Sequence, residues 1–422
     1  MAFPKYESYK YSEVAELGKI PSHWKVLRNR YLFIEPNERS LTGNETHLMM
    51  SQKLGLIPSS VEAKTLQSES YEGAKLCLKN DIVLNRLKAH LGVFSVAPCN
   101  GLVSPDYSIF RLINSKMEPK YFEHLFKTPT YISELNRKVK GIVVGFYRLY
   151  SEEFNDIVSL CPPIEEQQRI VAFLERTTAE IDEAISKKQR LIKLLQEQKA
   201  VIINQAVTQG INPKAPMRES GVEWIGEVPE HWEIIRTKNI FRLVTEPAPK
   251  NNSEELLSVY SDIGVKPRKE LEERGNKAST TDGYWFVKKG DIIVNKLLAW
   301  MGAIGVSEYD GVTSPAYDIL RASKPVDSKF YHYLFRNPIC TSKLKQHSKG
   351  IMEMRLRLYF DEFGNIKIPY PPFEEQQRIV AFIDRTTAEI DEVIAQQYRV
   401  IETLKEFKQI LISNAVTGEI KV

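Results

Sequence analysis

Two nearly identical stretches decide the fold of this chain: residues 162–185 read PPIEEQQRIVAFLERTTAEIDEAI, and residues 371–394 read PPFEEQQRIVAFIDRTTAEIDEVI. Each opens with a pair of prolines and, one residue later, a pair of glutamates. Proline is tolerated in the first turn of a helix, and acidic side chains there interact favourably with the helix dipole. Each stretch runs on to a glycine, Gly210 or Gly418, a residue that often follows a helix end. We therefore predict one long helix in each half of the chain.

Apolar residues recur at heptad spacing along both predicted helices, through Val171, Leu174 and Ile181 in the first and Val380 and Ile383 in the second. Polar residues interrupt both seams at equivalent places: Thr178, Lys188 and Lys199, then Thr387, Gln397 and Lys408. Matched stripes of equal length favour pairing of the two helices, although each stripe could instead pack only on its own neighbouring body. Two equivalent units associate most simply about a two-fold axis, which makes the paired helices antiparallel.

The repetition extends beyond the helices, so the chain is a duplicated unit of body and helix. IPSHWKVL at 20–27 matches VPEHWEII at 228–235, and GLVSPDYSIFRL at 101–112 matches GVTSPAYDILRA at 311–322. The bodies mix strand-like and helix-like segments without a regular βαβ series. We predict an α+β fold with two mixed α/β bodies, each followed by a long helix, and the helices pairing as an antiparallel coiled coil with pseudo-two-fold symmetry. The predicted boundaries are 1–160, 161–210, 211–370 and 371–422.

Composition indicates a globular protein without a membrane segment. Hydrophobic residues make up 42% and charged residues 27% of the 422 positions, and the net charge is +4. We expect no membrane span, because no apolar run reaches the roughly 18 residues that one needs. The four cysteines, Cys77, Cys99, Cys161 and Cys340, lack the spacing of a zinc site or disulfide framework, so a cytoplasmic setting is expected.

The chain resembles a specificity subunit of a type I restriction–modification system. The resemblance is carried by PPIEEQQRI and PPFEEQQRI, each at the junction of body and helix and each preceded by the same spaced residues: Gly141, Arg148, Leu149, Phe154 and Ile157, then Gly350, Arg357, Leu358, Phe363 and Ile366. The resemblance implies a non-catalytic subunit whose two target-recognition domains each read half of a bipartite target in double-stranded DNA. It also implies two methyltransferase subunits that carry S-adenosylmethionine, restriction subunits when present, and no cofactor on this chain.

On this interpretation the DNA contacts lie in the bodies, where basic and polar side chains suit phosphates and base edges. The candidates flank predicted strand ends or precede the long helices: Asn85, Arg86, Lys88, His90, Lys138, Lys140 and Arg148 in the first half, and Asn295, Lys296, Trp300, Lys349, Arg355 and Arg357 in the second. Arg148 and Arg357 repeat within RLY, which slightly favours a structural or partner-docking role for them over DNA contact. Trp24 and Trp232 are expected in the core.

The helix starts carry the candidate docking residues for the methyltransferase subunits: Glu165, Glu166, Gln167, Gln168 and Arg169, then Glu374, Glu375, Gln376, Gln377 and Arg378. Their identity in both copies is what identical docking of two identical partners requires. The alternative is an ordinary solvated helix surface.

Two further classes of function are weighed against DNA recognition. An autonomous nuclease is suggested by Asp106 with Glu118 and Lys120, and a methyltransferase by YPPF at 370–373. Pro119 interrupts the strand that the nuclease motif needs, and the second copy has Ala316 in place of Asp106. The third class is a coiled-coil scaffold that does not contact DNA.

Overall fold

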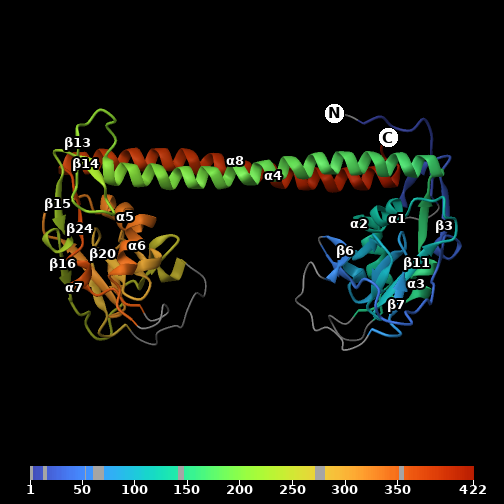
Figure 1. The fold of residues 1–422 in the computed structure, drawn as a ribbon, viewed down its shortest axis with the longest axis horizontal. Coiled ribbons are helices and arrows are strands. Elements are labelled where there is room, and N and C mark those ends of the chain that lie inside the picture. The colour runs from blue at the N-terminus through green and yellow to red at the C-terminus, as the bar shows by residue number, and fades with distance from the viewer. Residues whose placement is uncertain are drawn as a thin grey trace. The chain divides into compact units, whose positions relative to one another are not determined.

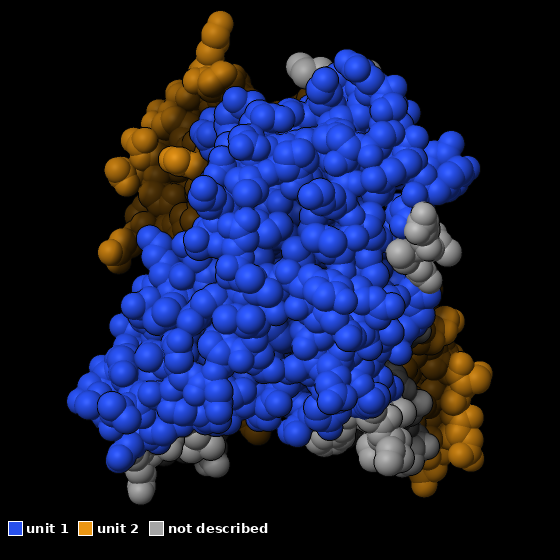
Figure 2. All heavy atoms as spheres, turned by 90° about the vertical axis from the view of Figure 1, so that its right-hand side faces the viewer, with its two compact units in different colours: residues 1–188, 399–422 blue, residues 189–398 orange. Residues whose placement is uncertain are grey.

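The computed structural model describes residues 3–12, 17–52, 54–59, 71–140, 147–270, 281–350 and 356–422. The chain divides into two compact units, which Figure 2 colours separately. Unit 1 comprises residues 1–188 and 399–422, and unit 2 comprises residues 189–398. Each unit therefore contains one body together with part of each long helix.

In its described residues, the body of unit 1 contains short antiparallel strands and three α-helices (Figure 1). Its elements are β1 Tyr9–Tyr11, β2 Lys19–Pro21, β3 Lys25–Arg28, β4 Phe33–Ile34, β5 Leu48–Ser51, β6 Gly55–Pro58, β7 Lys75–Cys77, β8 Ile82–Asn85, β9 Phe94–Val96, β10 Gly101–Val103, β11 Tyr107–Leu112, α1 Pro119–Phe126, α2 Pro129–Lys138, α3 Ser151–Asp156 and β12 Val158–Cys161. Its main sheet has the order β4-β11-β8-β9.

The body of unit 2 repeats this plan, with the sheet order β16-β23-β20-β21. Its elements are β13 Met217–Glu219, β14 Glu227–Pro229, β15 Glu233–Arg236, β16 Phe241–Val244, β17 Leu257–Tyr260, β18 Gly264–Pro267, β19 Trp285–Val287, β20 Ile292–Asn295, β21 Ile304–Val306, β22 Gly311–Thr313, β23 Tyr317–Ala322, α5 Ser328–Arg336, α6 Pro338–Gln346, α7 Phe360–Phe363 and β24 Lys367–Tyr370. The register repeats as well, since Tyr107 pairs with Asn85 and Tyr317 with Asn295. The predicted duplication of mixed bodies is confirmed.

Aromatic side chains fill the core of each body, between the main sheet and its helices. In unit 1 the rings of Phe110 and Phe154 stack with centroids 3.9 Å apart. In unit 2 the rings of Phe335 and Phe363 meet edge to face at 5.0 Å. Such rings bury a large apolar area and dominate the energetics of a core. Trp24 and Trp232 are 0% and 1% exposed, so the prediction that both tryptophans lie in the core is confirmed.

The two long helices are α4, Ile164–Gln209, and α8, Phe373–Thr417. Gly210 and Gly418 follow them with φ of 78° and 80°, a left-handed conformation that glycine adopts without a steric penalty. The predicted helices and their terminating glycines are confirmed. Within the described ranges, no helix is long and apolar enough to cross a membrane.

The helices pair in antiparallel fashion within each unit. In unit 1, Lys408 Nζ of α8 lies 2.6 Å from Asp182 of α4. Near the end of α8, the carbonyl of Val416 accepts a hydrogen bond from Tyr121. Tyr121 packs on Trp24, which donates to Glu166 at the start of α4, so the end of one helix lies near the start of the other. Unit 2 holds the equivalent ion pair, Lys199 with Asp391, also at 2.6 Å. Val171, Leu174 and Ile181 of α4 share one buried apolar cluster with Leu411 and Ala415 of α8, which confirms pairing of the helices.

Candidate nucleic-acid interface and helix junctions

The end of β8 in unit 1 is tied to the turn before β11. Asn85 is buried, and its Oδ1 accepts a hydrogen bond from Leu87 N at 3.1 Å. The next residue, Arg86, donates from Nε to the carbonyl of Asp106 at 2.9 Å and from Nη2 to that of Pro105 at 2.8 Å. The carbonyl of Arg86 in turn accepts from Leu149 N at 3.1 Å. Three distant segments of the chain therefore meet at Arg86.

Unit 2 repeats this framework with a lysine in place of the arginine. Asn295 Oδ1 accepts a hydrogen bond from Leu297 N at 3.1 Å. Lys296 donates to the carbonyl of Pro315 at 3.2 Å and lies 3.2 Å from the carboxylate of Asp318. The carbonyl of Lys296 accepts from Leu358 N at 2.9 Å. The predicted clusters therefore do come together, but Asn85 and Asn295 act inside them as buried caps, with little surface to offer a base.

The remaining members of the strand-end clusters differ in exposure. Lys88 is exposed. His90 is half-buried, with its ring 5.6 Å from that of Tyr147. In unit 2 the indole Nε1 of Trp300 donates to the carbonyl of Leu297 at 3.0 Å, and Lys345 Nζ lies 4.8 Å above the Trp300 ring. A lysine over an aromatic face places positive charge beside a partly exposed stacking surface.

A second basic pair closes a loop in each body. Lys140 and Arg148 exchange both backbone hydrogen bonds at 2.9 Å, and so do Lys349 and Arg357. The side chain of Lys349 pairs with Glu362 at 2.6 Å, and that of Lys140 pairs with Glu153. Lys138 ends α2 and is half-buried. Arg355 and Gly141, named above, lie outside the described residues.

The two arginines of these loops have different surroundings. Arg148 Nη2 lies 3.3 Å from Asp106 Oδ1, and its side chain is 46% exposed. Arg357 is also exposed, but the residue equivalent to Asp106 in its body is Ala316. Both arginines therefore remain accessible to a ligand, and only Arg148 is held by a carboxylate of the turn.

At the start of α4, two of the predicted docking residues face the body instead of solvent. Glu166 accepts from Tyr6 and, at 3.1 Å, from Trp24 Nε1, and it lies 2.8 Å from His23 Nε2. Burial alone would raise the pKa of the Glu166 carboxyl, but the hydrogen bonds from Tyr6, His23 and Trp24 hold it below its ordinary value. Gln167 is fully buried, accepting from Glu118 N at 3.0 Å and donating to the carbonyl of Pro162 at 2.9 Å.

The start of α8 repeats these contacts. Gln376 is fully buried, accepting from Asp327 N at 2.9 Å and donating to the carbonyl of Pro371 at 2.8 Å. Glu375 lies 2.7 Å from His231 Nε2. The structure thus gives Glu166, Gln167, Glu375 and Gln376 the internal task of fixing each helix to its body. The other predicted docking residues are exposed: Glu165, Gln168, Arg169, Glu374, Gln377 and Arg378.

Sequence reasoning missed an ion cluster, built around a buried aspartate, that occurs in both bodies. Arg111 of β11 binds Asp81 at 2.8 and 2.9 Å and also reaches Glu38 at 2.8 Å. In unit 2, Arg321 binds Asp291 at 2.9 and 2.8 Å and reaches Glu246 at 2.8 Å. Hydrogen bonds to Asp81 raise the pKa of Arg111, and those to Asp291 raise that of Arg321. The signal was present, since an aspartate and an arginine recur at matched positions of both copies.

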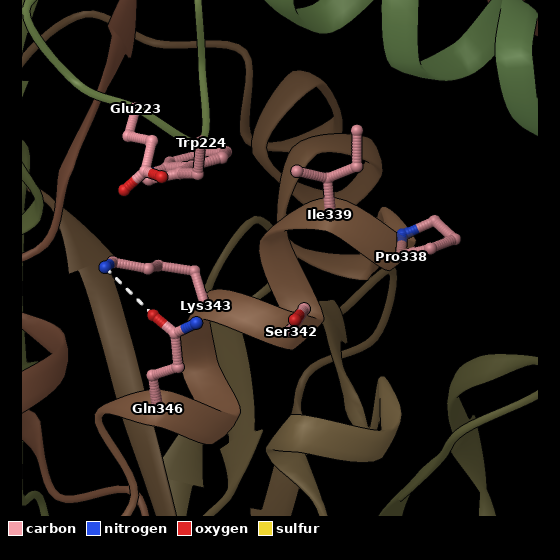
Figure 3. A pocket seen from close by; sticks show the side chains of 7 residues that line it. All are labelled: Glu223, Trp224, Pro338, Ile339, Ser342, Lys343 and Gln346. Carbon is pink, nitrogen blue, oxygen red and sulfur yellow. Dashed lines mark hydrogen bonds between the residues drawn. The ribbon is translucent and has the colours of Figure 1, made fainter.

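Unit 2 also has a surface hollow of about 500 Å³ beside the start of α6 (Figure 3). Glu223 and Trp224 line one side, and Ile339 and Lys343 of α6 line the other. Lys343 Nζ donates to Gln346 at 3.0 Å. The lining brings together a single acid and a single amine and is not arranged as a catalytic site. In the part of the chain that the structure describes, no three His, Cys, Asp or Glu side chains are grouped to hold a metal ion.

Comparison with known proteins shows which proteins this chain is similar to. Residues 229–403 match the family described as Type I restriction modification DNA specificity domain. The whole chain aligns at 24% identity with 98% of the type I restriction enzyme MjaVIII specificity subunit of Methanocaldococcus jannaschii. The chain is therefore similar to type I restriction–modification specificity subunits over its whole length, and the family model matches within its second half.

Solved structures share its fold. One, described as the structural basis of complex assembly and conformational transition of the type I R-M system, superposes with a TM-score of 0.67 at 18% identity, covering 94% of this chain and 98% of the other. The HsdS subunit from Thermoanaerobacter tengcongensis superposes with a TM-score of 0.57 at 17% identity, covering 95% and 98%.

Proposed function

We propose that this chain is the non-catalytic subunit that selects the DNA target of a type I restriction–modification complex. In this proposal each body, acting in the cytoplasm, reads one half of a bipartite site in double-stranded DNA. The observation that carries the proposal is the repeated framework around Arg86 and Lys296, which presents exposed basic groups from two separate bodies. Basic side chains bind phosphates, and arginine, lysine and asparagine also contact base edges.

The proposal assigns docking of two methyltransferase subunits to the outer faces of the helices. The exposed residues of both helix starts lie on equivalent positions, as two identical partners require. Farther along, Val201 of α4 and Ile410 of α8 occupy equivalent positions and are 53% and 57% exposed. Exposed apolar groups rimmed by charge are typical of a protein interface. S-adenosylmethionine would bind to the methyltransferase subunits and not to this chain, and restriction subunits would join when present.

The proposal leaves catalysis to the partners. The acids of the nuclease-like sequence have other tasks, because Asp106 pairs with Arg148 and Glu118 caps α1 by accepting from Lys120 N at 3.2 Å. The alternative of an autonomous nuclease or methyltransferase therefore has no specific observation in its favour. A scaffold without DNA contact would leave the exposed arginines of both bodies unexplained.

The test measures DNA binding by the assembled methyltransferase over a range of salt concentrations, and methyl transfer by this chain alone. We expect affinity to fall steeply with salt, because bound phosphates release counterions. We also expect no methylation or cleavage by the isolated chain with S-adenosylmethionine or Mg²⁺. Turnover by the isolated chain would contradict the non-catalytic assignment, and salt-independent or absent DNA binding would support the scaffold.

A further inference from the structure

The turn at Pro105–Asp106 holds two arginines in unit 1. The Arg86 side chain donates to the backbone carbonyls of Pro105 and Asp106, and Arg86 Nη2 lies 3.8 Å from Asp106 Oδ1. The same carboxylate oxygen is 3.3 Å from Arg148 Nη2. The backbone of Arg148 is fixed as well, because it exchanges two hydrogen bonds of 2.9 Å with Lys140. Arg148 is therefore an exposed guanidinium fixed at both of its ends.

Unit 2 keeps the backbone of this arrangement but lacks the carboxylate. Arg357 exchanges the equivalent two bonds of 2.9 Å with Lys349. Ala316 stands where unit 1 has Asp106, and Lys296 pairs with Asp318 instead. Among the described residues, no ion-pair partner holds the side chain of Arg357. The two bodies thus present the same arginine in two settings: one has a carboxylate of its turn as a partner, and the other has an alanine at that position.

Two further basic side chains, Lys75 and Arg86, lie beside the turn that holds the oriented arginine. Lys75 donates to the carbonyl of Tyr107, next to the turn, at 2.6 Å. Burial lowers the pKa of Lys75, and the nearby positive charge of Arg86 lowers it further. Basic side chains attract the phosphate backbone, so Lys75 and Arg86 would assist the approach of DNA to Arg148.

We propose that Arg148 reads a guanine in the half-site of unit 1, that Asp106 is its positioning residue, and that Arg357 contacts a phosphate in unit 2. This inference depends on the proposed DNA-recognition function. A guanidinium binds the O6 and N7 atoms of guanine through two parallel hydrogen bonds, which demand a fixed orientation. A phosphate accepts a guanidinium from many directions, so an arginine without a positioning carboxylate suffices there.

The test uses the assembled methyltransferase with the wild-type chain and with Arg148→Gln, Asp106→Ala and Arg357→Gln. Methylation of a randomised target library measures base preference, and binding at several salt concentrations measures phosphate contacts. We expect Arg148→Gln and Asp106→Ala each to lower the preference for one G·C pair, at the same position of one half-site, by roughly 5- to 150-fold. We expect Arg357→Gln to retain every base preference and to reduce the salt slope by about 0.9.

Two results would overturn the inference. One is an Arg148→Gln complex that keeps all base preferences and loses about 0.9 of salt slope, as a phosphate contact would. The other is an Asp106→Ala complex whose base preferences are unchanged. Because unit 2 already has an alanine, Ala316, at the equivalent position, this variant is expected to fold, and it decides the test if the Arg148→Gln complex does not assemble. A wild-type complex without any sequence preference would instead refute the proposed function itself.

Discussion

Truncating Gln376 tests whether the repeated helix start is an internal anchor. Gln376→Ala removes a fully buried amide that accepts from Asp327 N and donates to the carbonyl of Pro371. Each backbone group left without a partner costs about 1–3 kcal/mol. The higher helix propensity of alanine returns only a few tenths of that. With two such groups, we therefore expect the free energy of unfolding to fall by about 2–5 kcal/mol.

The neighbouring glutamine supplies the matched control. Gln377 has the same side chain at the next position of α8 but is exposed, so Gln377→Ala should change the unfolding free energy by no more than about 0.5 kcal/mol. Urea titrations followed by tryptophan fluorescence give both values, provided that the slopes of the transitions agree. Gln167→Ala and Gln168→Ala repeat the comparison in unit 1. Equal midpoints for Gln376→Ala and Gln377→Ala would refute the anchoring role.

Three further changes test other parts of the structure. Burial, reinforced by the charge of Arg336, lowers the pKa of His332 from 6.5 to about 3. The unfolded chain therefore binds more protons than the folded one below about pH 6.5, and stability should fall as the pH drops. His332→Gln should make urea midpoints depend less on pH over this range, and an unchanged dependence would contradict the explanation. Gly418→Ala should lower the free energy of unfolding by about 2–4 kcal/mol in urea titrations, because its φ is +80° and the new Cβ would overlap Pro21. Gly73→Ala is the control: its φ is +73° but no atom lies near the new Cβ, so the loss should be only about 1–2 kcal/mol. Equal losses would contradict the overlap. One extra heptad in each long helix, which adds about 10 Å, should lengthen the unread spacer by roughly one to three base pairs in target selection, and an unchanged spacer in an active complex would refute this.

The long helices could be predicted because their signals are local and repeated. The Pro-Pro start, the heptad seam and the glycine stop all lie within one continuous segment, so local rules suffice. Duplication of Val171 and Leu174 as Val380 and Ile383 then indicated pairing, since each stripe matched the other in register. The antiparallel direction followed from symmetry alone.

The helix starts show where the sequence was ambiguous. Glu166 and Gln167 recur as Glu375 and Gln376, which identical external docking and identical internal anchoring explain equally well. The residues of each helix start lie partly on a buried and partly on an exposed face of the helix. The sequence does not show which face is buried, whereas the structure does, because the backbone of Glu118 contacts Gln167 and that of Asp327 contacts Gln376. The asparagines Asn85 and Asn295 were assigned to DNA for a similar reason, because their capping partners lie in an unpredicted turn.

The ion cluster of Arg111 could not be assembled from the sequence because its members are distant. Asp81 lies 30 residues away and Glu38 lies 73 residues away. Pairing of β11 with β8 brings Arg111 and Asp81 together, and no local sequence pattern specifies that pairing. Repetition marked these residues as important in both bodies without indicating which of them meet.

Methylome sequencing of cells that carry this chain and its methyltransferase subunit tests the central claim most directly. The claim is that two separate bodies read two halves of one target. It predicts methylated bases in a two-part motif whose halves are separated by unspecified base pairs. It further predicts that replacing residues 1–160 with the matching part of a relative changes one half of the motif and leaves the other intact. A single continuous motif, or simultaneous change of both halves after that exchange, would contradict the claim.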